Sequence, residues 1–430
     1  MIYKISIAKI IHISCAALIA LVFMSKLSFK WTKIIPYSIP PFIFQHGVHP
    51  FINFGLQLFL ALVLFFIWVK LKEKPPMSVT YKMYIYTMIT VLIVQTLFQI
   101  TLVNFSHSVL VQLGGLGMAI MLILIYGVVI PSLLDLDKFI TWVKTISVVL
   151  VIASFLTLPL FYTDMFRGGR FVGFFKHIPH MVTASTSAFI FFLPKIFDET
   201  PWTLKRNTLI VLLGLMIIAL CVLLTSTKAA FVTILISAIA SIIVFKSNKL
   251  SFRLFKFAVL SSLLLSILLM GIPTAQFVSD ISTGKISFGL RPAQDGVQTR
   301  MEEVSRGWSM FERSPYFGLG LLYKFLNNRD EGIEVESYNS FKDPHNLFVS
   351  AAVIGGYPLF ALAIFGYILM IVGSIRGMRH RDNNQKILGI FLLAHLPVFV
   401  IYHAHFSLGG MGDRIYWLVF GYLGISDSEI

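Results

Sequence analysis

Cysteine and charge are scarce in this sequence, and their scarcity excludes several classes of protein. Only two cysteines occur in 430 residues, Cys15 and Cys221, and both lie inside apolar runs. A disulfide framework or a cysteine metal site therefore has no support. Charged residues make up 13% of the chain and hydrophobic residues 57%. We expect the two cysteines to be packing residues within an apolar protein.

Alternating strand patterns, internal repeats and a cleavable leader are also missing. Without ten-residue alternation a membrane β-barrel is excluded, and without a visible repeat a transporter built from inverted halves loses support. The first apolar run, 5 to 24, lacks a small-residue cleavage site, so we expect it to remain as the first span.

Long apolar runs dominate what is present. Many reach about 18 residues, the length at which a helix crosses roughly 30 Å of hydrocarbon. The sequence therefore predicts an all-α, polytopic membrane protein with about 12 transmembrane helices. The expected spans run over 5–24, 51–69, 83–103, 108–130, 139–162, 181–197, 207–225, 229–245, 254–275, 347–373, 386–402 and 414–425.

The net charge of +15 comes from basic residues spread over short loops, which argues against a nucleic-acid surface. Lysine and arginine are enriched in cytoplasmic loops. With both termini in the cytoplasm, nearly every basic loop falls on the cytoplasmic side. The loop with Lys26, Lys30 and Lys33 is the exception.

This orientation places a long polar loop, 276–345, outside the cytoplasm. It holds ten of the twenty acidic residues of the chain, and a segment this long and polar is expected to form a subdomain containing amphipathic helices. We therefore predict three parts: transmembrane helices 1–9 over 1–275, the large loop subdomain over 276–345, and transmembrane helices 10–12 over 346–430.

The start of the loop contains the first candidate site. In 299–314 four apolar residues recur at helical spacing, while Arg300 and Arg306 lie off that stripe. The pattern predicts an amphipathic helix on the membrane surface. The alternative is that both arginines snorkel or pair with neighbouring glutamates. The apolar stripe consists of Met301, Val304, Trp308 and Phe311.

The end of the loop contains the second candidate. Pro344 predicts a helix entry, so His345 and Asn346 are expected at the N-terminal edge of the next span. A neutral imidazole there could take a proton from a hydroxyl, because histidine titrates near neutral pH. A capping or interface histidine is the alternative. No histidine has a metal-ligand partner four residues on within a charged helix, so we expect no metal site.

Two further cations fall on the same side of the membrane. Lys228 lies between two apolar runs, where it needs water, protein or a phosphate. Arg170 follows two glycines that would let a ligand approach the backbone. Interface snorkelling and a flexible loop are the respective alternatives. Together with the loop candidates, these cations suit a substrate with a diphosphate leaving group and an acceptor hydroxyl.

The order of these motifs resembles the O-antigen ligase and polymerase superfamily, membrane glycosyltransferases that use undecaprenyl-diphosphate-linked glycans. The motifs are TRMEEVSRGWSMFERSPYFGLG, PHNLFVSAAVIGGYPLF, GGRFVGFFKHIPH and LLTSTKAAF. The resemblance implies that Arg300 contacts the lipid diphosphate, that His345 activates the acceptor hydroxyl, and that Arg170 and Lys228 line the same cavity. Lys228 departs from the arginine usual in the family, although a lysine still binds phosphate.

The resemblance implies a bacterial inner-membrane protein that transfers a glycan on the periplasmic side, with catalytic His345 and Arg300. Substrate-binding roles are expected for Lys228, Arg170, Asn346 and Arg306. The acceptor is either lipid A core, as in a ligase, or another lipid-linked repeat unit, as in a polymerase. No cofactor and no nucleic acid are expected. A lipid-linked glycan transporter or flippase, and a structural assembly partner without activity, are the alternatives from other classes.

Overall fold

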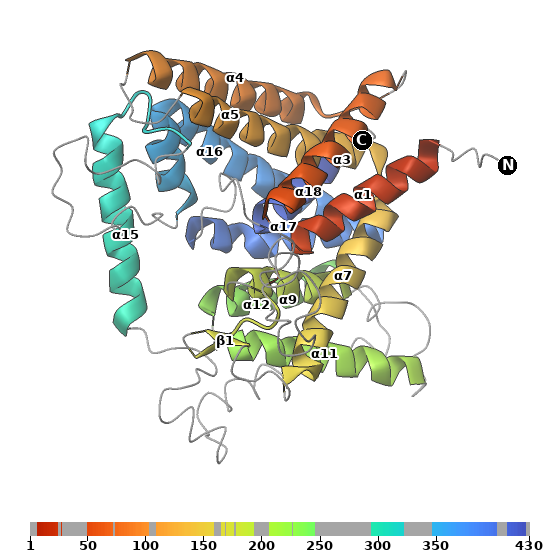
Figure 1. Ribbon diagram of the computed structural model, residues 1–430. Helices are drawn as coiled ribbons and strands as arrows, with labels where there is room; N and C mark the ends of the chain where they lie inside the picture. Colours follow the sequence, from red (N-terminus) through yellow and green to blue (C-terminus); the bar gives the residue numbers. More distant parts are fainter. Residues whose placement is uncertain are drawn as a thin grey trace, which may run out of the picture. The chain divides into compact units, whose positions relative to one another are not determined.

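The computed structural model describes a protein that is helical almost throughout (Figure 1). This confirms the all-α class. The one sheet within the described ranges is a hairpin of two strands with two residues each. The structure describes residues 7–24, 27, 50–71, 74–102, 109–158, 165–167, 169–175, 178–192, 206–225, 227–245, 294–321, 346–401 and 411–426.

Each expected span coincides with a helix except 254–275, which lies outside the described residues. The helices are α1 (Ile7–Met24), α3 (Pro50–Lys70), α4 (Val79–Leu102), α5 (Val109–Leu124), η2 (Ile125–Val129), α6 (Ile130–Leu133), α7 (Leu136–Leu156), α9 (Ile178–Phe192), α11 (Arg206–Thr225), α12 (Lys228–Val244), α15 (Gln294–Arg313), α16 (Leu347–Arg379), α17 (Asn383–Ile401) and α18 (Met411–Ser426).

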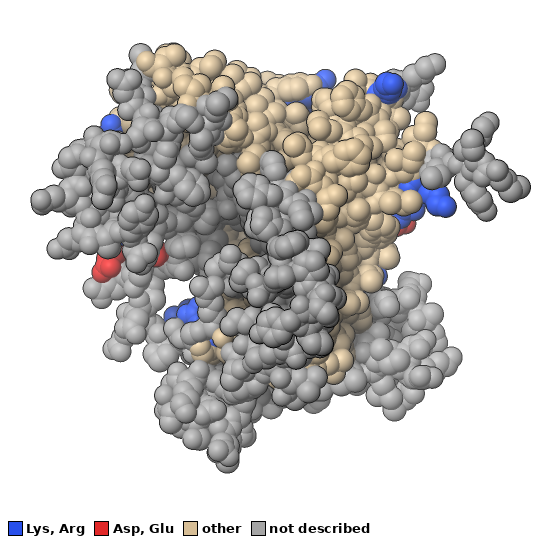
Figure 2. Space-filling view, viewed as in Figure 1, with Lys and Arg blue, Asp and Glu red and all other residues tan. Residues whose placement is uncertain are grey.

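Several of these helices are long and apolar enough to cross a membrane. Among the described residues there are 5 such helices, and shorter apolar helices accompany them. Most of the described surface in Figure 2 carries no charged side chain, as lipid contact requires. The chain is a multi-pass membrane protein, and the larger span count remains a prediction. The long helices are Ile7–Met24, Val79–Thr101, Gln112–Leu133, Leu136–Leu156 and Leu347–Arg379.

The chain forms two compact units, each assembled from separate stretches of sequence. Unit 1 comprises Met1–Leu71, Leu133–Arg291 and Ile375–Ala394, and unit 2 comprises Lys72–Ser132, Pro292–Ser374 and His395–Ile430. The predicted three-part division at 275 and 345 remains a prediction, because the residues around both boundaries lie largely outside the described ranges.

Unit 1 is built around α9, which packs against α7, α11 and α12. Small hydroxyl side chains line its buried surface, including Ser185 and Ser187 of α9 and Ser147 of α7, all fully buried. In apolar surroundings small residues let helix backbones approach closely, so the packing is by van der Waals contact. Phe191 of α9 adds aromatic contacts, since its ring lies 6.2 Å from that of Phe139 and 5.2 Å from that of Phe391.

Unit 2 contains a break in α16 at Gly355 and Gly356. Gly356 has φ 64° and ψ −158°, which lies outside the helical region and is open essentially to glycine alone. Two residues later Pro358 has no N–H to donate, so the carbonyl of Ile354 loses its helical partner. The N–H of Tyr357 bonds outside the helix, which frees the carbonyl of Val353 as well.

The segment that follows α15 takes up these freed groups. The N–H of Leu319 donates to the carbonyl of Val353 at 2.6 Å, and the N–H of Gly320 donates to that of Ile354 at 2.9 Å. In return the N–H of Tyr357 donates to the carbonyl of Pro315 at 2.7 Å. Because unpaired backbone groups are costly in an apolar environment, these bonds hold the segment 314–320 against the break.

The glycines at this crossing have no room for a side chain. A Cβ on Gly318 would lie 2.4 Å from the backbone nitrogen of Gly355, and one on Gly356 would lie 2.5 Å from the carbonyl oxygen of Pro315. Both glycines also have positive φ. The two backbones therefore touch directly, and any larger residue would separate them.

Replacing Gly356 with alanine should destabilise the protein by about 2 kcal/mol or more, from backbone strain and overpacking together. Thermal unfolding of the detergent-purified protein measures the effect as a lower Tm. Gly117→Ala in α5 is the matched control, because nothing lies within 4 Å of its Cβ position, and its Tm should not fall. Equal Tm values for the two variants would contradict the close crossing.

Candidate functional site

The amphipathic helix expected over 299–314 is present as α15, which begins earlier, at Gln294. Arg300 lies in this helix, and its side chain is outside the described set. Arg306 lies two turns further on, with an exposed side chain. The helix therefore presents at least one of the two predicted cations at its surface.

The apolar stripe of α15 divides between protein and surroundings. Phe311 is 3% exposed and packs edge-on against Tyr357 of α16, with ring centroids 5.0 Å apart. Trp308 is 43% exposed and Met301 67% exposed. The C-terminal turns of α15 are thus anchored on α16, while Met301, earlier in the helix, is exposed, as a helix at a membrane surface would leave it.

Asn346 stands directly before α16 and caps it. Its Oδ1 accepts hydrogen bonds from the N–H groups of Phe348 at 3.0 Å and Val349 at 3.1 Å, and its own carbonyl accepts from Ser350 at 2.8 Å. This is the N-cap arrangement for which asparagine is favoured. Asn346 therefore lies at the predicted helix edge, and His345, the residue before it, lies outside the described residues.

Arg170 belongs to a hairpin formed by β1 (Phe166–Arg167) and β2 (Arg170–Phe171). The N–H of Phe174 donates to Ser154 Oγ of α7 at 3.2 Å. Gly173, at φ 54°, lies so close to Ser154 that a Cβ would clash with it. These contacts hold the segment that follows the hairpin to α7, and the Arg170 side chain is half-buried.

Lys228 is the first residue of α12 and is exposed. The turn before it is held by its own hydroxyls, since Thr225 Oγ1 donates to the carbonyl of Val222 at 2.7 Å and Thr227 Oγ1 to that of Thr225 at 3.0 Å. Strand β2 and helix α12 both pack against α9 and α11. Unit 1 thus carries Arg170 and Lys228 on elements supported by the same two helices.

The candidate residues divide between the two units. Unit 2 contains Arg300, Arg306 and Asn346, and unit 1 contains Arg170 and Lys228. Within unit 2 the segment 314–320 joins α15 to the same helix that Asn346 caps. Convergence of all the candidates on one cavity remains a prediction.

Two glutamines of α4 were missed by the sequence reasoning. Gln99 Nε2 donates to the carbonyl of Phe317 at 2.7 Å and to that of Ile354 at 3.2 Å, and Gln95 Nε2 donates to that of Tyr316 at 3.2 Å. Both side chains are buried. The sequence does contain a signal for this contact, because the two amides are four residues apart and so lie on one face of an otherwise apolar span.

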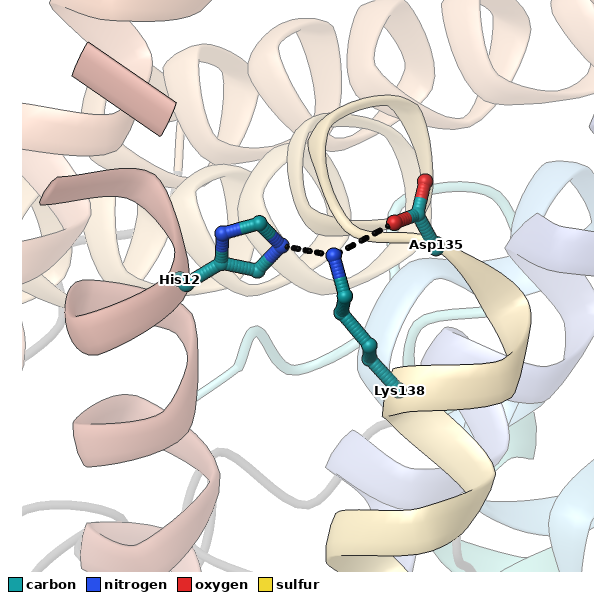
Figure 3. Close-up of polar contacts among 3 residues, drawn as sticks. All are labelled: His12, Asp135 and Lys138. Carbon is teal, nitrogen blue, oxygen red and sulfur yellow. Dashed lines mark hydrogen bonds and ion pairs between the residues drawn. The ribbon is translucent and has the colours of Figure 1, made fainter. Parts of the chain in front are cut away.

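The sequence reasoning also missed a cluster of three polar side chains in unit 1 (Figure 3). Lys138 Nζ lies 2.6 Å from His12 Nε2 and 2.8 Å from Asp135 Oδ2. An ammonium group can only donate, so the contact requires His12 Nε2 to accept. The group joins α1 to the start of α7. Because Lys138 and Asp135 are 44% and 70% exposed, the ion pair contributes little to stability.

No group of three or more His, Cys, Asp or Glu side chains that could hold a metal ion occurs in the described ranges. Cys15 and Cys221 are both buried and unpaired by disulfide. The charges that the described candidates offer to a ligand are therefore those of guanidinium and ammonium groups, which suit phosphate oxygens.

Comparison with known families gives a match over part of the chain. Residues 213–364 match the family described as O-Antigen ligase, a range that contains Lys228, Arg300, Arg306 and Asn346 but not Arg170. Comparison with curated proteins gives no match. The matched range runs from α11 past the break in α16, and it includes three of the four motifs that suggested the resemblance. The match over residues 213–364 confirms the resemblance to the O-antigen ligase and polymerase superfamily.

Proposed function

We propose that this protein is a membrane glycosyltransferase that moves a glycan from undecaprenyl diphosphate to the hydroxyl of lipid A core, on the periplasmic side of the bacterial inner membrane. The observation that carries the proposal lies in unit 2, within the family match. There the arginine-bearing helix α15 is tied through 314–320 to α16, the helix that Asn346 caps. The residue next to that cap is His345.

The reaction begins with deprotonation of the acceptor. The imidazole of His345 takes the hydroxyl proton while the oxygen forms a bond to the anomeric carbon of the donor sugar. The bond from that carbon to the diphosphate oxygen breaks, and undecaprenyl diphosphate leaves with the bonding electrons. Attack opposite the leaving group inverts the configuration at the sugar carbon.

Charge on the diphosphate grows as this bond breaks, so cations near it stabilise the transition state more than the ground state. Arg300 has this role in the proposal, with Arg306, Lys228 and Arg170 as further phosphate or glycan contacts. Lys228 at the start of α12 adds its charge to the positive end of the helix dipole, which favours an anion at that position.

A polymerase would run the same chemistry with another lipid-linked repeat unit as the acceptor. The family match supports both, since the ligase and polymerase reactions share donor and leaving group. A transporter or flippase would move the lipid-linked glycan without breaking a bond to it. Supplying purified protein with lipid-linked donor and each acceptor in turn separates the three functions by their products.

Replacing His345 or Arg300 with alanine should lower the transfer rate by about 100-fold or more, through loss of the base or of leaving-group stabilisation. The measurement is in vitro transfer by variants that insert and purify normally. Arg313→Ala is the control, because Arg313 is an exposed cation in the last turn of the same helix and has no role in the proposal. Full transfer by either His345→Ala or Arg300→Ala would overturn the proposal.

Variants at Asn346 separate capping from substrate contact. Asn346→Ala should lose about 1 kcal/mol of stability, whereas Asn346→Ser should keep it, because serine caps about as well as asparagine. If the amide also orients the substrate, Asn346→Ser should transfer about tenfold more slowly despite an unchanged Tm. Wild-type transfer by Asn346→Ser would restrict Asn346 to its capping role.

A further inference from the structure

The side chain of Gln99 contacts both the segment 314–320 and the break in α16, within unit 2. Its Nε2 donates to the carbonyl of Phe317 at 2.7 Å and to that of Ile354 at 3.2 Å. Phe317 belongs to the segment after α15, and Ile354 is the residue whose carbonyl Pro358 leaves without a helical partner. One amide on α4 therefore joins three separate stretches of the chain.

The surroundings of Gln99 fit it closely. The side chain is 4% exposed, and Gly320 leaves space for it, since a Cβ on that glycine would lie 2.8 Å from Gln99 Oε1. Phe98, the preceding residue of α4, stacks on Phe317 with ring centroids 4.7 Å apart. Loss of this amide would remove the donor to the carbonyl of Phe317 and leave the carbonyl of Ile354 with the N–H of Gly320.

Gln95, one turn earlier on α4, is a natural comparison. Its side chain is also buried, at 6% exposed, but its Nε2 makes one bond of 3.2 Å to the carbonyl of Tyr316. Its Oε1 has no hydrogen-bond partner within the described structure. Gln95 therefore contacts one stretch of chain where Gln99 contacts two.

From this geometry we infer that Gln99 is a positioning residue, which sets where helix α15 stands relative to α16. It acts through the segment 314–320, and so it determines where Arg300 and Arg306 lie relative to Asn346 and the adjacent His345. Its effect on transfer rests on the proposed function, whereas its effect on the placement of α15 does not.

The placement is tested first, without any activity. Spin labels on cysteines replacing Met301 of α15 and Ile368 of α16, which are 67% and 49% exposed, report the distance between the two helices. Gln99→Leu should broaden or shift the distance distribution, because leucine fills the space without donating a hydrogen bond. Gln95→Leu should leave the distribution as in the wild type.

Transfer kinetics test the consequence. Displacing reacting groups by about 1 Å can lower a rate by about 100-fold, so Gln99→Leu should lower kcat by about tenfold or more with the KM for the donor little changed. Gln95→Leu should stay within about twofold of the wild type.

The pH dependence of activity in Gln99→Glu is a further test, because a general loss of structure would not produce it. A carboxylate cannot donate to either carbonyl, but a protonated carboxyl group can donate its one O–H to one of them, and burial favours its protonation. The activity of Gln99→Glu relative to the wild type should therefore rise as the pH falls from about 8 to about 5, while that of Gln99→Leu stays flat.

The outcomes separate the two proposals. If the wild type transfers glycan and Gln99→Leu keeps both its distance distribution and its kcat, the positioning role is overturned. If the wild type transfers nothing from a lipid-linked donor, the proposed function fails. The distance measurement then decides alone: broadening in Gln99→Leu supports the placement role, and an unchanged distribution overturns it.

Discussion

Unpaired backbone groups are hardest to tolerate in an apolar protein, and this constraint explains the arrangement of unit 2. Gly356 and Pro358 interrupt α16 and release the carbonyls of Val353 and Ile354. The released groups are paired by the N–H groups of Leu319 and Gly320 and by the amide of Gln99. A break that would be costly by itself becomes the place where the segment following α15 is held.

The same contacts connect the scaffold to the chemistry that we propose. The segment 314–320 continues directly from α15, which carries Arg300 and Arg306, and α16 begins at the cap formed by Asn346. Aromatic packing of Phe311 on Tyr357 also anchors α15 on α16. Helices α15 and α16 are therefore joined at one point, as the proposed site for a diphosphate and an acceptor hydroxyl needs.

Unit 1 achieves its rigidity by different means. Its helices carry small residues and buried hydroxyls, such as Ser147 and Ser185, which allow close backbone approach. Arg170 and Lys228 stand on a short hairpin and on a helix start that both pack against α9 and α11. The cations of this unit are held by packing of neighbouring elements, whereas those of unit 2 depend on hydrogen bonds at a helix break.

The sequence by itself determined the helices, because an apolar run in lipid must satisfy its backbone internally and its length is readable from hydropathy. It also determined α15, through its helical periodicity, and the start of α16, through Pro344. Only the tertiary structure decided that Gln99 pairs with the break in α16, because that hydrogen bond joins residues 255 positions apart. The tertiary structure also decided which residues of the apolar stripe of α15 are buried against protein and which are exposed. Periodicity marks an apolar face but does not say whether protein or lipid covers it, since both are equally apolar.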